Sequence, residues 1–211
     1  MIDYWRQNSA ALLAALDQHA VMVFSALGLA AGLAIILVAW LLRHPRWQGW
    51  TVYFFSLLYA VPSFAFFVLL LPLTGLGMKT AVIVLATYSE YVLLRSWLTG
   101  LATVDPTLVE VARGLGMTRR QCFFKVQLPL ALPAIFAGLQ VALASLMGIA
   151  TIAATINAGG LGTFLFAGLA TSRPTPIIWG TLLTVGLTLV SMAALKLIEW
   201  LLERRWQPER K

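Results

Sequence analysis

Charged residues are scarce in this chain. Asp, Glu, Lys and Arg make up only 11% of its 211 residues, whereas 60% are hydrophobic and the mean hydropathy is +0.86. Such a composition is far from that of a soluble globular domain and is typical of a protein embedded in lipid. Each membrane crossing needs about 20 apolar residues, so residues 1–211 suit a single integral-membrane domain of a few helices. No room remains for a soluble catalytic domain.

Cysteine and histidine are nearly absent, and so are nucleotide-binding motifs. The single cysteine, Cys122, excludes an internal disulfide and a thiolate metal cluster, and we expect a free thiol facing the cytoplasm. His19 and His44 are separated by an apolar run long enough to span a membrane, which excludes a shared metal site. The glycine-rich stretch 157–162 has no following lysine, so it is not a phosphate-binding loop. We therefore expect no catalytic residues and no metal site.

Five long apolar stretches are present instead. They predict an all-α membrane protein with spans at about 20–42, 50–71, 78–98, 132–156 and 177–199. Pro62 predicts a kink inside the second span, and Pro72 predicts its end. The glycine-rich stretch interrupts the uncharged run 126–172 and predicts a bend, followed by a short apolar segment at 163–171.

The basic residues predict the orientation of the chain in the membrane. With five spans and the N-terminus outside, 12 of the 15 Lys and Arg residues face the cytoplasm, as the positive-inside rule requires. The inner set is Arg43, Arg46, Arg95, Arg113, Arg119, Arg120, Lys125, Lys196, Arg204, Arg205, Arg210 and Lys211, and the outer set is Arg6, Lys79 and Arg173. The net charge of +7 is thereby explained by topology, and we expect no nucleic acid partner. This orientation places both the C-terminus and the loop 100–130 in the cytoplasm.

This loop carries a polar, basic segment between two apolar spans. Asp105-Pro106 predicts the start of a short surface helix over 107–114, and Gly116 predicts a turn after it. Thr118 is placed to cap a second short helical stretch. An ordinary loop that only fixes topology explains the basic residues, but it does not explain the spacing described next.

Six residues of the loop resemble a known signature. Glu110, Ala112 and Gly116, followed by Val126, Leu128 and Pro129, match the spacing of the EAA motif in permease subunits of bacterial ABC importers. Val111 replaces the first alanine of that motif, a small apolar change. The resemblance implies that these six residues couple the chain to a cytoplasmic ATPase. It also implies that this chain needs no cofactor, because ATP and Mg are bound by the partner ATPase, and that the chain is not an enzyme.

The resemblance extends over about residues 20–200 and is closest to permeases for osmoprotectants such as glycine betaine, carnitine and choline. It is carried by segments 61–63, 104–106, 112–117, 125–133 and 156–162. It implies a type I importer in the bacterial cytoplasmic (inner) membrane, with two permease subunits, two cytoplasmic ATPases and an extracytoplasmic binding protein that selects the solute. The permease pair is either two identical chains or two paralogues. A permease for an amino acid or another amine remains an alternative; an ATP-independent channel or secondary carrier explains the spans but not the loop.

Two further regions are candidates for the pathway. Glu90 lies near the middle of the third span, where a carboxylate costs about 3 kcal/mol, so it should face the interior, become neutral or find a partner. It then either fixes helix packing or attracts a cationic headgroup. Arg95 is rotated from it by roughly 140° and is a poor partner.

The second region is the bend with Asn157, Gly159, Gly160 and Gly162. It is either a tight turn or a flexible gate that meets the binding protein.

A cluster of aromatic residues in the second span has two interpretations. Packing and lipid contact explain most of them, and a cation–π surface for a quaternary ammonium is the other interpretation. The cluster consists of Tyr53, Phe54, Phe55, Tyr59, Phe64, Phe66 and Phe67.

Overall fold

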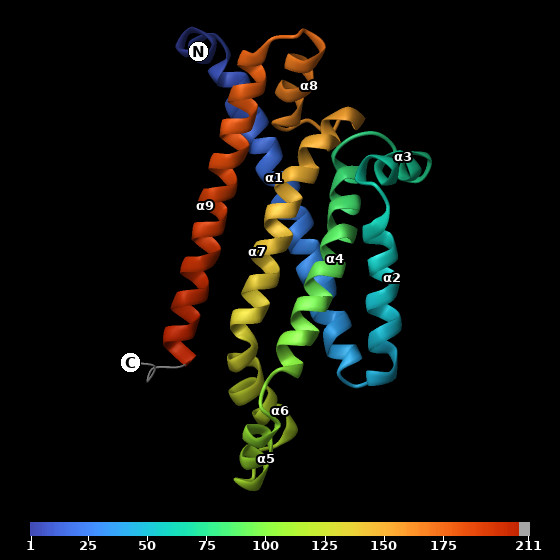
Figure 1. Cartoon of the computed structure of the whole chain (residues 1–211), viewed down its shortest axis with the longest axis vertical. Helices are drawn as coiled ribbons and strands as arrows, with labels where there is room; N and C mark the ends of the chain where they lie inside the picture. Colours follow the sequence, from blue (N-terminus) through green and yellow to red (C-terminus); the bar gives the residue numbers. More distant parts are fainter. Residues whose placement is uncertain (207–211) are drawn as a thin grey trace.

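Three long helices form the centre of the molecule. The structure is a computed structural model that describes residues 1–206. In it α1 (Ile2–Leu41), α4 (Met78–Ala102) and α7 (Leu128–Ile152) lie against one another, with α2 (Gln48–Ala60) on one side and α9 (Pro174–Trp206) on the other (Figure 1). The regular structure of the described part is entirely helical, which confirms the all-α class.

Small residues bring the central helices close together. Ala26, Ala30 and Ala34 recur every four residues on one face of α1 and are fully buried. Gly138 of α7 lies so close to α4 that a Cβ atom there would be 2.7 Å from the Cβ of Ser96. Close approach through small residues is the usual way in which helices associate inside a membrane.

The second predicted span is not a single helix. The chain breaks after α2, and α3 (Ser63–Thr74) leaves at an angle of 98°. Val61 is extended, with φ −66° and ψ 131°, because the residue before a proline is disfavoured in the helical region. The kink predicted at Pro62 is confirmed, and it is sharp enough to divide the segment into two helices. Pro72 does not end the second segment, since α3 continues to Thr74 and stops at Gly75, where φ is +80°.

Each of the other four predicted spans falls largely within a longer helical stretch. α1 begins at Ile2, and its first turns contact α9: the rings of Trp5 and Trp179 are 4.8 Å apart, and the indole N–H of Trp179 donates to the Met1 carbonyl at 3.2 Å. The helix of the third predicted span, α4, continues to Ala102. The helix of the fourth, α7, begins at Leu128, and Pro129 fits its first turn. The helix of the fifth, α9, covers Pro174–Trp206.

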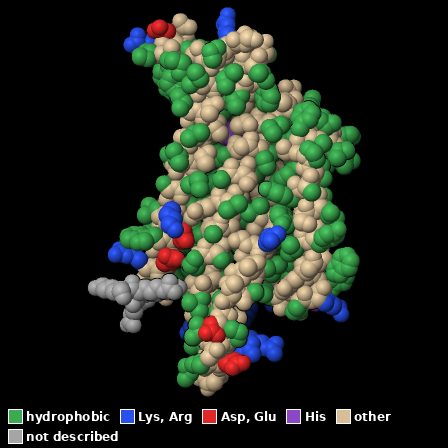
Figure 2. Space-filling model, in the orientation of Figure 1, with side chains coloured by type: hydrophobic (Ala, Val, Ile, Leu, Met, Phe, Trp, Pro, Cys, Tyr) green, Lys and Arg blue, Asp and Glu red, His purple; other side chains and the backbone are tan. Residues whose placement is uncertain are grey.

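Among residues 1–206, four helices are long and apolar enough to cross a membrane, and the bent pair α2–α3 adds a fifth crossing if it counts as one span. On the face shown in Figure 2, charged side chains lie at the upper end and over the lower half, and a largely uncharged band separates the two groups. The start of α1 and the end of α9 lie at opposite ends of the molecule (Figure 1). Arg210 and Lys211 of the predicted inner set lie outside the described residues.

Candidate functional site

A helical hairpin, residues 105–127, projects beyond the central helices at one end of the molecule (Figure 1). Its first helix, α5 (Pro106–Gly114), begins where the sequence predicts. The side chain of Asp105 accepts a hydrogen bond of 2.9 Å from the backbone N–H of Thr107, and Pro106 occupies the first turn. Such a cap satisfies a backbone donor that has no partner within the helix.

Gly116 turns the chain at the end of α5. Its φ is +82°; its N–H donates to the Arg113 carbonyl at 2.9 Å, and the N–H of Met117 donates to the Ala112 carbonyl at 3.1 Å. This pair of bonds is the Schellman motif, which needs a left-handed residue that glycine adopts without strain. A Cβ atom on Gly116 would meet nothing within 4 Å, so the requirement for glycine comes from the backbone alone.

The second helix of the hairpin, α6 (Arg119–Cys122), is continuous with α7. Thr118 and Gln121 form a reciprocal capping box, with bonds of 3.3 Å and 2.9 Å, which confirms the predicted cap. A π-helical turn, η2 (Phe123–Gln127), then leads directly into α7. The hairpin is therefore attached to a helix of the central bundle without an intervening loop.

Small side chains hold the two halves of the hairpin together. Ala112 is 4% exposed, and the Sγ atom of Cys122, which is 3% exposed, lies 3.9 Å from the Val109 carbonyl oxygen. Cys122 is free, as expected. It is the last residue of α6, and its side chain is buried against α5 instead of facing solvent. Its small, weakly polar side chain fits such a contact.

An apolar strip covers the outer face of α5. Leu108, Val111 and Leu115 are 45%, 55% and 76% exposed, and their spacing of three and four residues places them on one side of the helix. Phe124 adds a further exposed aromatic ring. Sequence reasoning missed this strip, although the helical spacing within a loop expected to lie in water was available as a signal. An exposed apolar strip of this kind is a candidate for a protein interface.

The six motif residues differ in how far they are buried. Glu110 and Gly116 are exposed, Val126 and Leu128 are half-buried, and Ala112 and Pro129 are buried. The exposed pair lies on the same hairpin as the apolar strip. The coupling role of all six residues stays a prediction.

The glycine-rich bend, residues 157–162, lies at the opposite end of α7. Asn157, Gly159 and Gly160 have φ values of +61°, +76° and +78°, so the chain turns sharply, as predicted. The N–H of Gly160 donates to the side-chain Oε1 of Gln18 at 3.1 Å, and the N–H of Gly77 donates to the Ile156 carbonyl at 2.9 Å. The bend is thus tied to both α1 and the start of α4.

Glycine is required in the bend for space as well as for conformation. A Cβ atom on Gly159 would collide with the side-chain amide of Gln18, and one on Gly162 would collide with the Thr151 carbonyl. The apolar segment predicted at 163–171 follows, and it forms the short helix α8 (Gly162–Ala170). These contacts favour the tight-turn interpretation, and the gate role stays a prediction.

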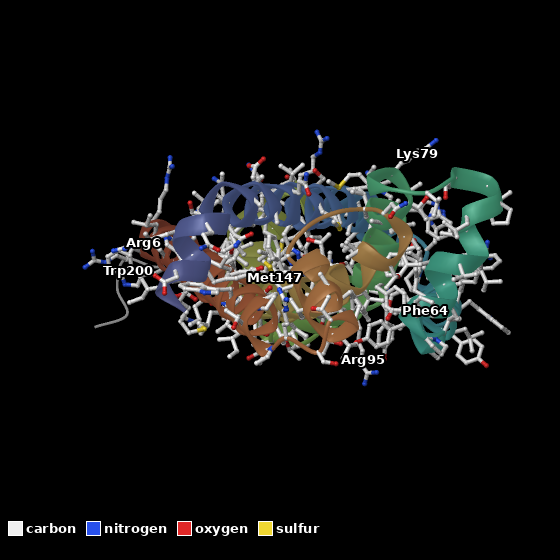
Figure 3. The ribbon with its side chains drawn as sticks, turned by 90° about the horizontal axis from the view of Figure 1, so that it is seen from above. Arg6, Phe64, Lys79, Arg95, Met147 and Trp200 are labelled. Atoms are coloured by element: carbon white, nitrogen blue, oxygen red, sulfur yellow. The ribbon has the colours of Figure 1, made fainter. Side chains whose placement is uncertain are left out.

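Glu90 faces the interior of the bundle from the middle of α4, and it belongs neither to the hairpin nor to the glycine-rich bend. Its side chain is 1% exposed, and neither carboxylate oxygen has a hydrogen-bond partner among residues 1–206. Arg95 is not its partner, since the Arg95 Nη1 atom donates to the Tyr91 hydroxyl at 2.6 Å. Seen from above in Figure 3, Arg95 points outward on the side away from α1, whereas Met147 lies near the middle. The role of Glu90 stays a prediction.

Within the described part, no three His, Cys, Asp or Glu side chains come together in a way that could hold a metal ion.

Comparison with known proteins gives one consistent result. The family model of the binding-protein-dependent transport system inner membrane component matches residues 21–207. The osmoprotectant import permease protein OsmW of Salmonella typhimurium is 35% identical over 96% of this chain and 94% of its own length. The glycine betaine/carnitine/choline transport system permease protein OpuCB of Bacillus subtilis is 33% identical over 85% of this chain and 83% of its own. Among solved structures, an inward-facing MetNI methionine ABC transporter has a chain with a TM-score of 0.81 and 19% identity, covering 90% of this chain and 95% of that one.

Proposed function

The chain belongs to the family of inner membrane components of binding-protein-dependent transport systems, and from this premise we propose that it carries osmoprotectants such as glycine betaine, carnitine or choline. It is a permease subunit of an ABC importer, a multi-pass membrane protein whose relatives are transport permeases and not enzymes. The substrate class is supported by the names of relatives that match nearly the whole chain. The methionine transporter supports the fold alone.

The hairpin is the surface that receives the ATPase. The observation that carries this assignment is the exposed strip of Leu108, Val111 and Leu115 on a hairpin that continues directly into α7. Apolar side chains exposed to water gain free energy when a partner covers them. The family implies ATPase and binding-protein partners; ATP and Mg then belong to the separate ATPase subunits, and this chain needs no cofactor of its own.

The remaining faces fit the rest of the assembly. The N-terminus lies outside and the end of α9 lies inside, which places the glycine-rich bend on the side of the binding protein. A second permease, identical or paralogous, completes the pair, and the most apolar part of α9, which is only 6% buried in this chain, is covered by that permease or by lipid. The hairpin then lies in the cytoplasm with Arg113, Arg119 and Arg120.

Transport by the purified importer tests the proposal. The permease is reconstituted into liposomes with its ATPase and binding protein, and uptake of radiolabelled glycine betaine, carnitine and choline is measured with and without ATP. We expect uptake of at least one of the three that requires both ATP and the binding protein. Uptake of amino acids alone would refute the substrate class, and uptake without ATP would refute the importer mechanism.

A further inference from the structure

A polar stripe runs along the face of α4 that the core does not cover. Tyr91, Arg95, Thr99 and Thr103 recur every four residues and therefore lie on one side of the helix. Polar and charged side chains within a membrane helix face protein or a water-filled cavity, because exposure to lipid is costly. This stripe consequently marks a face that lies against another subunit or against an aqueous pathway.

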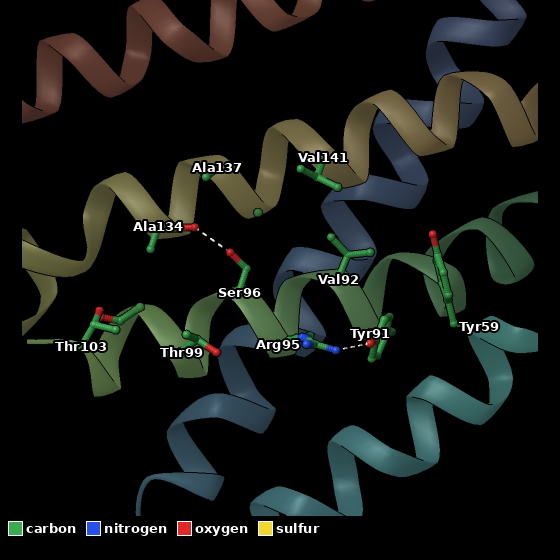
Figure 4. A pocket seen from close by; sticks show the side chains of 12 residues that line it. Tyr59, Tyr91, Val92, Arg95, Ser96, Thr99, Thr103, Ala134, Ala137 and Val141 are labelled. Carbon is green, nitrogen blue, oxygen red and sulfur yellow. Dashed lines mark hydrogen bonds between the residues drawn. The ribbon is translucent and has the colours of Figure 1, made fainter.

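The stripe forms one wall of a pocket. The pocket has a volume of about 660 Å³, and its other walls come from α7, through Ala134, Ala137, Gly138 and Val141, and from Tyr59 of α2 (Figure 4). Gly100 and Gly138 lie where α4 and α7 touch, so the floor of the pocket is close to backbone. A space of this size accommodates a small organic solute.

Aromatic rings are concentrated at one end of the pocket. The ring centroids of Tyr59 and Tyr91 are 5.1 Å apart, and those of Tyr59 and Tyr88 are 5.6 Å apart. The Tyr88 hydroxyl is occupied by the Val61 carbonyl, which fixes its ring at the break between α2 and α3. The faces of such rings attract a quaternary ammonium through cation–π interactions. Tyr59, at 37% exposed, is accessible from the pocket.

Arg95 provides a cationic group beside these rings. Its Nη1 atom donates to the Tyr91 hydroxyl at 2.6 Å, and its guanidinium lies 5.9 Å from the centroid of the Tyr91 ring (Figure 4). No acidic residue lines the pocket, and Arg95 forms no ion pair within residues 1–206. A guanidinium has five N–H donors, so most of them remain for a carboxylate. Repulsion from the same guanidinium directs a bound cation to the Tyr59 end of the pocket.

We propose that this pocket is a binding site for small zwitterions that carry both a trimethylammonium group and a carboxylate. The ammonium lies against the ring of Tyr59, and the carboxylate is bound by Arg95. This inference rests on the proposed function, because it names the groups that recognise its solute class within the permease itself. Part of the solute selection then belongs to this chain, whereas the family resemblance assigned it to the binding protein.

The test compares two solutes that differ in the carboxylate. Glycine betaine has a carboxylate and choline has none, although both have a trimethylammonium group. Uptake of each is measured for the reconstituted importer with Arg95→Gln, Arg95→Lys, Tyr59→Leu and Tyr59→Phe, together with ATPase stimulation by the loaded binding protein. Tyr53→Leu is the matched control for Tyr59→Leu. Tyr53 lies on α2 like Tyr59 and is 58% exposed, but it does not line the pocket.

Each variant has a distinct expected result. Arg95→Gln should lower betaine uptake about tenfold and leave choline uptake within about twofold, since a charged hydrogen-bond partner of the carboxylate alone is lost. Arg95→Lys keeps the charge and should fall between wild type and Gln. Tyr59→Leu should lower uptake of both solutes about fivefold, Tyr59→Phe should retain it, and Tyr53→Leu should behave as wild type.

The outcomes separate this inference from the proposed function. If the wild-type importer transports none of glycine betaine, choline and carnitine, the proposed function fails and the zwitterion site fails with it. If the wild type transports betaine, but Arg95→Gln retains full betaine uptake or loses betaine and choline equally, only the zwitterion site is refuted. A wild type that transports betaine but not choline supports the requirement for a carboxylate. Betaine uptake by Arg95→Gln and Arg95→Lys then tests the role of Arg95: lower uptake by Gln than by Lys supports the site, and equal uptake refutes it. Copurification of the ATPase with each variant shows that the assembly is intact.

Discussion

Gln18 and Gly160 are joined by a hydrogen bond across 142 residues of chain: the N–H of Gly160 donates to the Oε1 atom of Gln18 at 3.1 Å. The bond ties the glycine-rich bend to α1 at the end of the molecule opposite the hairpin. Next to it, the backbone of Gly160 passes so close to α1 that an added Cβ atom would lie 3.1 Å from the Nδ1 atom of His19. The bend is therefore held by both conformation and contact.

Replacing Gly160 with alanine should destabilise the bend. Its φ of +78° strains a residue with a Cβ atom, and His19 must also shift, so we expect a loss of about 1–3 kcal/mol in stability. Thermal unfolding of the purified importer in detergent measures the effect. Gly28→Ala is the control, because Gly28 is helical and a Cβ atom there meets nothing within 4 Å. Equal melting temperatures for the two variants would contradict this account of the bend.

The apolar strip predicts an effect on ATPase docking. Leu115→Ser should reduce the amount of copurified ATPase about tenfold while membrane insertion stays normal. Leu115 is 76% exposed in the free chain, so the substitution removes contacts with a partner and few contacts within the chain. Leu115→Met, which conserves apolar volume, should retain the ATPase. A Ser variant that binds as much ATPase as wild type would show that the strip is not the docking surface.

Gly116 and Glu110 test the coupling motif. Gly116→Arg and Glu110→Arg should each lower transport far more than expression, since both positions are exposed on the hairpin. Gly116→Ala separates backbone strain from the bulk and charge of arginine. The φ of +82° at this position costs about 1–2 kcal/mol for any residue with a Cβ atom, and no neighbour is close enough to collide with the added methyl group, so alanine tests the strain alone. Full uptake and full ATPase stimulation by the loaded binding protein in Gly116→Arg would rule out a coupling role for this residue.

Glu90→Gln tests whether a charge is needed inside the membrane. Glu90 is buried in the core and does not line the pocket of Tyr59 and Arg95, so we expect nearly normal uptake and unchanged or higher thermal stability after removal of the ionisable group. Uptake of betaine and the melting temperature are the two measurements. Lost uptake with normal assembly would instead make Glu90 a pathway residue that attracts the cationic solute.

The orientation of the chain is accessible to labelling once the burial of Cys122 is taken into account. Cys122 is only 3% exposed, so the reporter should be a new thiol at the exposed position Arg120, in a Cys122→Ala background. Arg120→Cys should react with a membrane-impermeant maleimide in inside-out vesicles and resist it in intact spheroplasts. The ATPase is removed first so that it does not shield the site. Labelling from the outside would reverse the proposed topology.

Local rules predicted the parts of the fold that depend on neighbouring residues. The cap at Asp105, the capping box at Thr118 and the turn at Gly116 each follow from bonds within about five residues, and all three are present. The helix class of the chain follows from the length of its apolar runs.

Features that depend on distant contacts were not accessible from the sequence. The 98° break at Pro62 is held in part by the Tyr88 hydroxyl bound to the Val61 carbonyl, a contact between residues 27 positions apart. The start of α1 is fastened to α9 by the contact between Trp5 and Trp179, residues 174 positions apart. The pocket exists only because α4 and α7 lie side by side, which brings Arg95 to the same cavity as Ala134 and Val141. Spacing along the chain contains none of this information.

The continuity of the helix from the hairpin through α7 gives the molecule a lever. Residues Arg119–Ile156 form one helical body of 38 residues, about 57 Å long at 1.5 Å per residue. One end of this lever lies in the hairpin, and the other adjoins the bend that Gln18 holds. A rotation of about 5° around its midpoint displaces each end by about 2.5 Å, by the same geometry. A hydrogen bond does not survive such a displacement along its own axis, so a small tilt applied at the hairpin would release the contact between Gly160 and Gln18 at the other end if α1 stays in place.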